Sequence, residues 1–231
     1  MKKLNQLAGL IIVAIFGFST PVLAVENIAA TKHNLTVTGT GTIKTGDTTF
    51  ICGFCHSPHT DAGGPAPLWN RSLPLGTGYT MYTSATMDMA HVVANEVGSI
   101  SLACLSCHDG TIALDSLVNL PGSGGYTAGG AQPGTPYTFA GGVVNPANLM
   151  PAGVTNLGTN LTGDHPVSIT YDITADTAFE TIATAEAAGV SFFGAGGNEV
   201  ECASCHNPHE ATNATFLRVG IDTLCTSCHI K

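Results

Sequence analysis

The chain has 231 residues and a formal net charge of −9 at pH 7, from 7 Lys and Arg against 16 Asp and Glu. Nucleic acid is a poor partner for this acidic balance, because phosphate recognition depends on clustered cations. Only 10% of the residues are charged and 28 are Gly, a composition that permits close self-association.

The N-terminus has the pattern of a secretory signal peptide. Lys2 and Lys3 precede an apolar run over residues 7–18, and Val22-Leu-Ala24 follows as a small-residue cleavage site. A membrane anchor is the alternative, but the apolar run is short for a span of about 20 residues. We therefore expect a signal peptide at 1–24 and a secreted mature chain at 25–231 with no transmembrane segment.

The first half of the mature chain, residues 25–120, holds two Cys-x-x-Cys-His motifs, at 52–56 and 104–108. Helical periodicity is weak here and is visible only at 87–97 and 111–117. We expect short helices at these two places and irregular structure elsewhere.

The middle segment, residues 121–163, is dominated by Gly, Pro, Asn and Thr, which predicts a loop. A loop of this length is uncommon inside a compact domain. Its aromatic residues Tyr126, Tyr137 and Phe139 either make apolar contacts beneath the loop or lie in solvent-exposed coil, and the sequence leaves both alternatives open.

The second half, residues 164–231, holds two further Cys-x-x-Cys-His motifs, at 202–206 and 225–229. Alternating residues at 167–173 predict a short strand, and 177–188 has the strongest helical periodicity in the chain. The segment 202–209 repeats the segment 52–59, since both contain Cys-His-x-Pro-His. This echo indicates a duplication within one domain.

All eight cysteines belong to these four motifs. A Cys-x-x-Cys-His motif is the signature of covalent c-type haem attachment, in which both thiols form thioethers and the histidine binds the iron. Disulfides and a zinc site are alternatives, but neither requires a histidine after each cysteine pair. We expect four haem c groups. Their attachment residues are Cys52, Cys55, Cys104, Cys107, Cys202, Cys205, Cys225 and Cys228. Their proximal iron ligands are His56, His108, His206 and His229.

Four haems on a chain of this length leave too few residues to wrap each cofactor in an aliphatic core. The predicted fold class is a multihaem cytochrome c, mostly coil with a few short helices and minor strand, whose core is built around stacked haems. We expect a single tetrahaem domain at 25–231, with haem pairs in 25–120 and 164–231 joined by the Gly/Pro-rich segment.

The histidine supply bears on the second axial ligand of each iron. Nine histidines leave five for four distal positions, namely His33, His59, His91, His165 and His209. This supply favours bis-histidine haems of low reduction potential. Within His-x-Pro-His the second imidazole cannot easily reach the opposite face of the same iron, so it should bind a neighbouring one. Asp164 stands beside His165, where a carboxylate is placed to orient the imidazole.

Three other residues stand out. Arg71 and Arg218 are scarce cations in an acidic chain, and at least one is expected to pair with a haem propionate, with solvated surface as the alternative. Trp69 is expected to pack on a haem or in the core.

The chain resembles the OmcE-type extracellular tetrahaem cytochromes, doubled-motif multihaem cytochromes of metal-reducing bacteria that assemble into filaments. The resemblance lies in the order of the haem motifs and in the strings around them: Thr31-Lys-His-Asn-Leu35, Ala66-Pro-Leu-Trp-Asn-Arg71, Cys104-Leu-Ser-Cys-His-Asp-Gly-Thr111, Gly163-Asp-His-Pro-Val167 and the two Cys-His-x-Pro-His strings. It implies distal ligands at His33, His59, His165 and His209, with His91 spare. It also implies that His33 or His91 of one subunit completes a haem of the next.

Three functions are compatible with these features. The first is an extracellular, electron-conducting filament that reduces external acceptors such as metal oxides and contacts other multihaem cytochromes. The second is a monomeric periplasmic electron carrier with the same four haems. The third, a multihaem reductase, requires an iron with an open face, for which the motifs give no sign. We therefore expect an electron-transfer protein rather than an enzyme.

Overall fold

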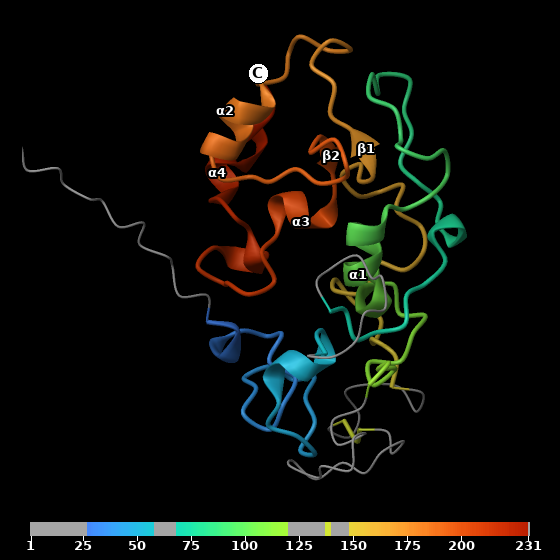
Figure 1. The fold of residues 1–231 in the computed structure, drawn as a ribbon, viewed down its shortest axis with the longest axis vertical. Helices are drawn as coiled ribbons and strands as arrows, with labels where there is room; N and C mark the ends of the chain where they lie inside the picture. The colour runs from blue at the N-terminus through green and yellow to red at the C-terminus, as the bar shows by residue number, and fades with distance from the viewer. Residues whose placement is uncertain (1–26, 58–67, 120–136, 140–147, 231) are drawn as a thin grey trace, which may run out of the picture.

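The computed structural model describes residues 27–57, 68–119, 137–139 and 148–230 (Figure 1). The predicted signal peptide, His59 and Tyr126 lie outside these ranges. Within them, no helix is long and apolar enough to cross a membrane.

Regular structure is sparse. The helices are α1 (Ser99–His108), α2 (Ile182–Ala187), α3 (Cys202–Cys205) and α4 (Ile221–Leu224). Two short strands, β1 (Ile169–Thr170) and β2 (Glu199–Val200), pair antiparallel. Single 3-10 turns lie at Ile28–Ala30, Ile51–Phe54, Gly76–Gly78, Ala214–Phe216 and Cys225–Ser227. The prediction of mostly coil with a few short helices and minor strand is confirmed.

The helical turns coincide with the four Cys-x-x-Cys-His motifs. The second motif ends α1, the third forms α3, and the first and fourth lie on 3-10 turns. In three motifs the histidine N–H donates to the carbonyl of the first cysteine, at 2.7 Å for His56, 3.1 Å for His206 and 2.9 Å for His229. Because residues three and four apart share one side of a helical turn, this geometry gathers two thiols and an imidazole on one side.

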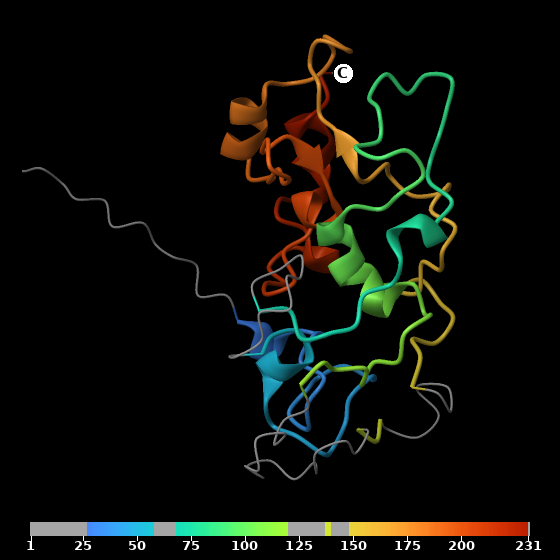
Figure 2. The ribbon, with the colours of Figure 1, turned by 45° about the vertical axis from the view of Figure 1, so that its right-hand side comes forward.

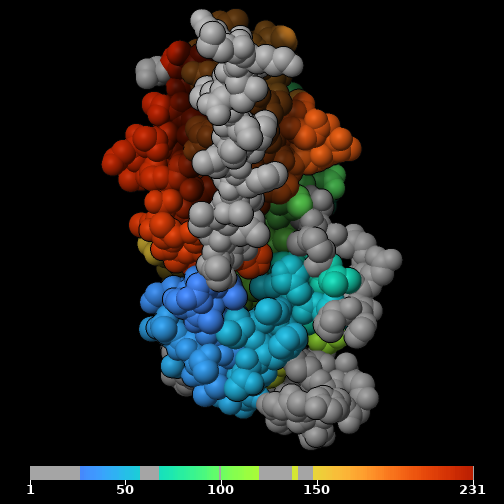
Figure 3. Space-filling model, turned by 60° about the vertical axis from the view of Figure 1, so that its left-hand side comes forward, coloured from blue at the N-terminus to red at the C-terminus, as the bar shows by residue number. Residues whose placement is uncertain are grey.

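The molecule is elongated (Figures 1 and 2). Residues 27–57 lie at one end, α2 and α4 lie at the other, and α1 lies between them. On the surface in Figure 3, residues 27–57 (blue) likewise lie below the orange and red C-terminal part of the chain.

The described residues bury three small hydrophobic clusters rather than one large core. The first contains Phe54, Leu114, Tyr137, Phe139 and Met150. The second contains Tyr79, Met81, Val97, Leu105 and Leu161. The third contains Met89, Ile169, Tyr171 and Val200. Tyr137 and Phe139 are therefore buried, and solvent-exposed coil was the wrong alternative for these two aromatic residues.

The predicted helix at 87–97 is wrong, because this segment pairs with β1 instead. The N–H of Thr170 donates to the carbonyl of Ala90, and the N–H of Val92 donates to the carbonyl of Ser168. Backbone groups used between segments are not available for helical hydrogen bonds.

The predicted helix at 111–117 is also wrong. The Asp109 carboxylate accepts from the Thr111 N–H at 2.7 Å, which forms a turn, and the Leu114 N–H donates to the carbonyl of Asn148. Side-chain and long-range partners therefore replace the helical bonds.

The remaining predicted elements are shorter than expected. The helix expected at 177–188 is confined to α2, where the Thr181 hydroxyl caps the N-terminus by accepting from the Thr184 N–H. The strand expected at 167–173 is confined to β1. Helix α1 was not predicted, because its Ser- and Cys-rich sequence has low helical propensity.

Candidate functional site

Three histidine pairs bring together residues that are far apart in the sequence. The ring centroids of His33 and His108 are 6.1 Å apart, those of His56 and His209 are 6.2 Å apart, and those of His165 and His229 are 6.5 Å apart. Each pair joins one motif histidine to one of the candidate distal histidines.

This spacing fits a metal ion held between the two rings. A metal–imidazole nitrogen bond is about 2 Å long and a ring nitrogen lies about 1 Å from its own centroid, so imidazoles on opposite faces of one metal have centroids about 6 Å apart. All three pairs match this value, although each was formed by a different part of the chain. The donor set therefore fits a six-coordinate haem iron.

Backbone carbonyls fix which ring nitrogen is left to bind a metal. The Nδ1 atoms of four histidines lie 2.7–3.0 Å from a carbonyl oxygen. The four histidines and their carbonyls are His33 with Pro208, His108 with Thr155, His165 with Pro166, and His206 with Thr215. A carbonyl only accepts, so Nδ1 carries the proton and Nε2 keeps the lone pair that a metal needs. The carbonyl of Pro166, rather than the predicted Asp164 carboxylate, orients His165.

His33 has a further feature that suits a ligand. Burial lowers the pKa of its imidazole below the ordinary value of 6.5. Its ring also stacks on Phe216, with centroids 4.3 Å apart. A neutral imidazole held in one orientation is ready to bind a metal.

The two other candidate histidines are arranged differently. His59, the candidate distal ligand that is left for a fourth pair with His206, lies outside the described residues. His91 hydrogen-bonds the Tyr82 carbonyl through Nε2 at 2.9 Å, and its buried Nδ1 has no partner among the described residues. The nitrogen of His91 that is engaged is thus the opposite one from that of the four histidines above.

The eight cysteines carry free thiols, and thiols of successive motifs lie together. Burial raises the pKa of Cys55 to about 12, and neighbouring Cys107 adds to the rise. A hydrogen bond between Cys104 and Cys202 raises the pKa of Cys104 and lowers that of Cys202. Burial raises the pKa of Cys205 to about 11, with Cys228 as the next cause.

The interactions between these thiols follow the order of the four motifs in the chain. The first motif meets the second through Cys55, the second meets the third through Cys104, and the third meets the fourth through Cys205. Cofactors attached at these positions would be neighbours in chain order.

The two halves share a backbone arrangement, which supports the duplication. In the first half, the Ser57 N–H donates to the carbonyl of Leu68 and the Asn70 N–H to that of Cys55, both at 2.8 Å. In the second half, Asn207 donates to Phe216 and Arg218 to Cys205, again both at 2.8 Å. Leu68 and Phe216 also share a positive φ, of 54° and 61°.

Two side chains complete this repeat: Asn70, which the sequence analysis missed, and Arg218, which it had singled out as a scarce cation. Asn70 Nδ2 donates to the Gly53 carbonyl at 2.7 Å, and Arg218 Nε donates to the Ala203 carbonyl at 2.8 Å. Gly53 and Ala203 occupy the same position within their motifs. In the sequence, Asn70 follows the first motif as Arg218 follows the third. This shared position is the signal that could have identified Asn70.

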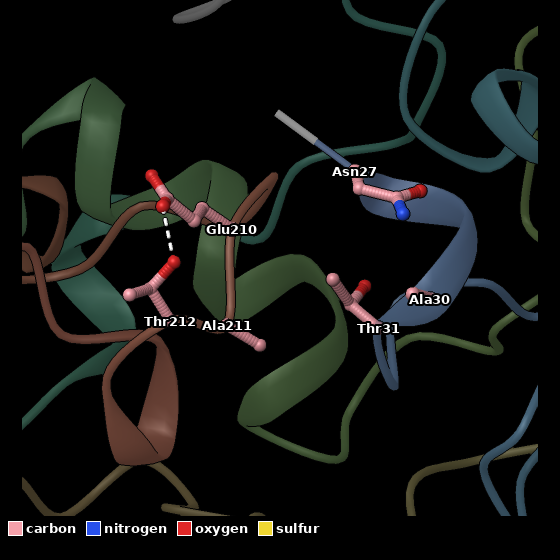
Figure 4. Close-up of a pocket in the computed structure, with 6 residues that line it drawn as sticks. All are labelled: Asn27, Ala30, Thr31, Glu210, Ala211 and Thr212. Carbon is pink, nitrogen blue, oxygen red and sulfur yellow. Dashed lines mark hydrogen bonds between the residues drawn. The ribbon is translucent and has the colours of Figure 1, made fainter. Parts of the chain in front are cut away.

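The other singled-out residues lie near the same sites. Trp69 packs edge-on against His56, with centroids 5.9 Å apart. Arg71 is buried, so a solvated surface is the wrong alternative for it. A cavity of about 290 Å³ opens between residues 27–31 and the turn after His209, where the Glu210 carboxylate accepts from Thr212 (Figure 4). It is at the lower limit of the size typical of ligand pockets.

The four motifs and the paired histidines define the class of the protein: the motifs indicate covalently bound haem c, and the chain has the features of a multihaem c-type cytochrome. The model of the Doubled CXXCH motif family matches residues 195–231, which contain the third and fourth motifs. No curated protein matches the chain. The shared backbone arrangement extends the likeness to the first half, because residues 52–57 and 68–70 repeat the geometry of 202–207 and 216–218.

Proposed function

We propose that the chain is a tetrahaem c-type cytochrome that passes electrons along four closely packed haems. The observation that carries this proposal is the set of three histidine pairs with centroids 6.1–6.5 Å apart. The iron at the first motif takes His56 and His209, the iron at the second takes His108 and His33, and the iron at the fourth takes His229 and His165. His206 and His59 remain for the third.

The haems supply one-electron redox chemistry, and the polypeptide supplies their ligands, order and environment. Carbonyls on Nδ1 hold the imidazoles of His33, His108, His165 and His206 in one tautomer and increase their basicity, which favours the ferric state and a low reduction potential. Two imidazoles per iron leave no position for substrate. The arrangement therefore suits electron transfer rather than catalysis at an open iron.

The contacts between thiols support a continuous path. Because successive motifs meet in chain order, neighbouring porphyrins would be attached a short distance apart from the first motif to the fourth. An electron entering at one end of the elongated molecule would leave at the other (Figure 1).

The finer proposal is a secreted protein that polymerises into an extracellular conducting filament, with other multihaem cytochromes or metal oxides as partners. The resemblance to OmcE-type cytochromes and the low content of charged residues support it. A monomeric periplasmic carrier is the second candidate. The pairing of His33 with His108 of the same chain favours it, because His33 is then not needed by a neighbouring subunit.

Intact mass spectrometry of the mature protein from a host that attaches haem c tests the core proposal, since four covalent haems are expected. Fewer haems, or disulfides in their place, would refute it. Electron microscopy of the same sample, together with sheared cell-surface material, separates the finer proposals. Regular filaments support the extracellular wire, and dispersed monomers support the carrier.

A further inference from the structure

Arg71 is a buried cation whose hydrogen-bond acceptors are uncharged. Only 3% of its surface is exposed. Its Nε donates to the Ser106 hydroxyl at 3.1 Å, and its terminal nitrogens donate to the carbonyls of Ser106, Ala113 and Leu114 at 2.6–2.9 Å. An arginine keeps its charge at any pH at which proteins fold. Burial of such a charge without a carboxylate is costly, so Arg71 calls for an explanation beyond packing.

The guanidinium lies between the first two haem-attachment motifs. The N–H of the preceding residue, Asn70, donates to the Cys55 carbonyl of the first motif at 2.8 Å, and the guanidinium donates to Ser106 within the second motif at 2.9 and 3.1 Å. It also hydrogen-bonds the sulfur of Cys107. Since these cysteines belong to different motifs, one fixed charge faces two haem sites.

One buried carboxylate acts in the opposite sense. Asp109 is 4% exposed and directly follows the second motif in the sequence. Its oxygens accept from the Tyr79 hydroxyl at 2.6 Å and from the Thr111 N–H at 2.7 Å rather than from Arg71. The negative charge of Asp109 therefore offsets part of the positive potential from Arg71 at the second motif. The electrostatic effect of Arg71 on a haem should be larger at the first motif.

The second half has no equivalent of Arg71. In the structural repeat, Asn70 corresponds to Arg218, and Arg71 therefore corresponds to Val219. Arg218 also lies beside a motif, with its Nε donating to the Ala203 carbonyl at 2.8 Å, but it is only partly buried, so solvent screens its charge more strongly. Among the described residues, the duplication has thus placed a fully buried arginine beside the first two motifs but not beside the last two.

We propose that Arg71 raises the reduction potentials of the haems in the first half above those in the second half. Reduction lowers the charge of an iron by one, so a nearby fixed cation stabilises the ferrous form. At an effective dielectric constant of about 20, Coulomb's law gives about a tenfold effect on the reduction equilibrium for two unit charges about 12 Å apart. This proposal rests on the proposed tetrahaem function.

The consequence is a direction for electron transfer. An external low-potential donor reduces a ferric haem of the second half. The electron then passes to a ferric haem of the first half, which becomes ferrous while the donor haem returns to ferric. No proton or atom is transferred in this step.

Spectroelectrochemical titration of the full haem-loaded chain tests the proposal with Arg71→Gln, Arg71→Lys and Arg218→Gln. Arg71→Gln keeps hydrogen-bond donors but removes the charge. It should lower at least one of the four midpoint potentials by a tenfold change in the reduction equilibrium, about 59 mV for a one-electron couple. Arg71→Lys keeps the charge and should stay within threefold of the wild type, as should Arg218→Gln.

The outcomes are distinguishable. Equal shifts in Arg71→Gln and Arg71→Lys, or no shift in Arg71→Gln with four low-spin haems present, would overturn the role of the Arg71 charge. If Arg71→Gln fails to load haem, NMR redox titration of the wild type decides the matter, because the two first-half haems must have the higher potentials. Absence of covalent haem from the wild type would instead refute the proposed function.

Discussion

Asn70 provides the most direct test of how the chain holds a haem motif in shape. Its side chain is 2% exposed and makes three hydrogen bonds. Nδ2 donates to the carbonyls of Gly53 at 2.7 Å and Asn119 at 2.9 Å, and Oδ1 accepts from the Asn119 N–H at 2.8 Å. One amide therefore ties the first haem motif to a segment about 50 residues later in the sequence.

The substitution Asn70→Ala removes all three bonds. Each contributes about 1 kcal/mol, and burial of the abandoned backbone groups adds to the loss, so we expect about 3–5 kcal/mol of destabilisation. For a chain of this size, about 2–4 °C of Tm is lost per kcal/mol, which gives a decrease of about 10 °C. Thermal unfolding of the haem-loaded protein, followed by far-UV circular dichroism, measures this shift.

Asn213→Ala is the matched control. Asn213 is also an asparagine after a motif, but its amide makes a single bond, to the carbonyl of Leu217 at 3.0 Å. Its removal should cost about 1 kcal/mol, or about 3 °C. Equal decreases in Tm for the two variants, or a decrease below 3 °C for Asn70→Ala, would show that the three buried bonds do not stabilise the first motif as described.

Further predictions concern ligation and pH. His209→Ala should leave four covalent haems but convert one of them to a high-spin state visible in the absorption spectrum, because His56 loses its partner; an unchanged low-spin spectrum would refute this pairing. His91→Ala should leave both haem content and spin state unchanged, because Nε2 of His91 is occupied by the Tyr82 carbonyl; a new high-spin haem would contradict this. Burial raises the pKa of Glu201 above 4.5, so the folded state holds this proton more tightly and the free energy of unfolding falls as pH rises from about 4.5 to the folded-state pKa. Glu201→Gln removes that dependence. Guanidinium unfolding at pH 4–8 should therefore show the free energy of unfolding of the variant rising relative to that of the wild type as pH increases; a constant difference would contradict the assignment.

The sequence was most informative where chemistry demands particular residues. Each Cys-x-x-Cys-His motif is local, and its two thiols and imidazole come together on a single helical turn, so spacing alone identified them. The candidate distal histidines were found by counting and by resemblance. Their partners were not predictable, because His33 meets His108 and His209 meets His56 through contacts between distant segments.

Secondary structure was harder to predict for a physical reason. Periodicity works where a helix packs one apolar side against a continuous core, but this chain buries three small clusters. At 87–97 the apolar residues face different clusters, since Met89 belongs to the third and Val97 to the second. In α1, tertiary contacts outweigh poor propensity: the Ser101 hydroxyl donates to the buried Glu201 carboxylate and accepts from the Cys202 N–H.

The pairing of His56 with His209 has a consequence for biogenesis. If the chain is exported as proposed, the first motif would emerge about 150 residues before the histidine that would close its iron. A truncated or half-translocated chain would therefore present a reactive, five-coordinate haem able to bind small ligands or oxygen. Only a chain that extends through residue 209 could close that face. The coordination state of this haem would therefore report whether the chain has emerged as far as His209.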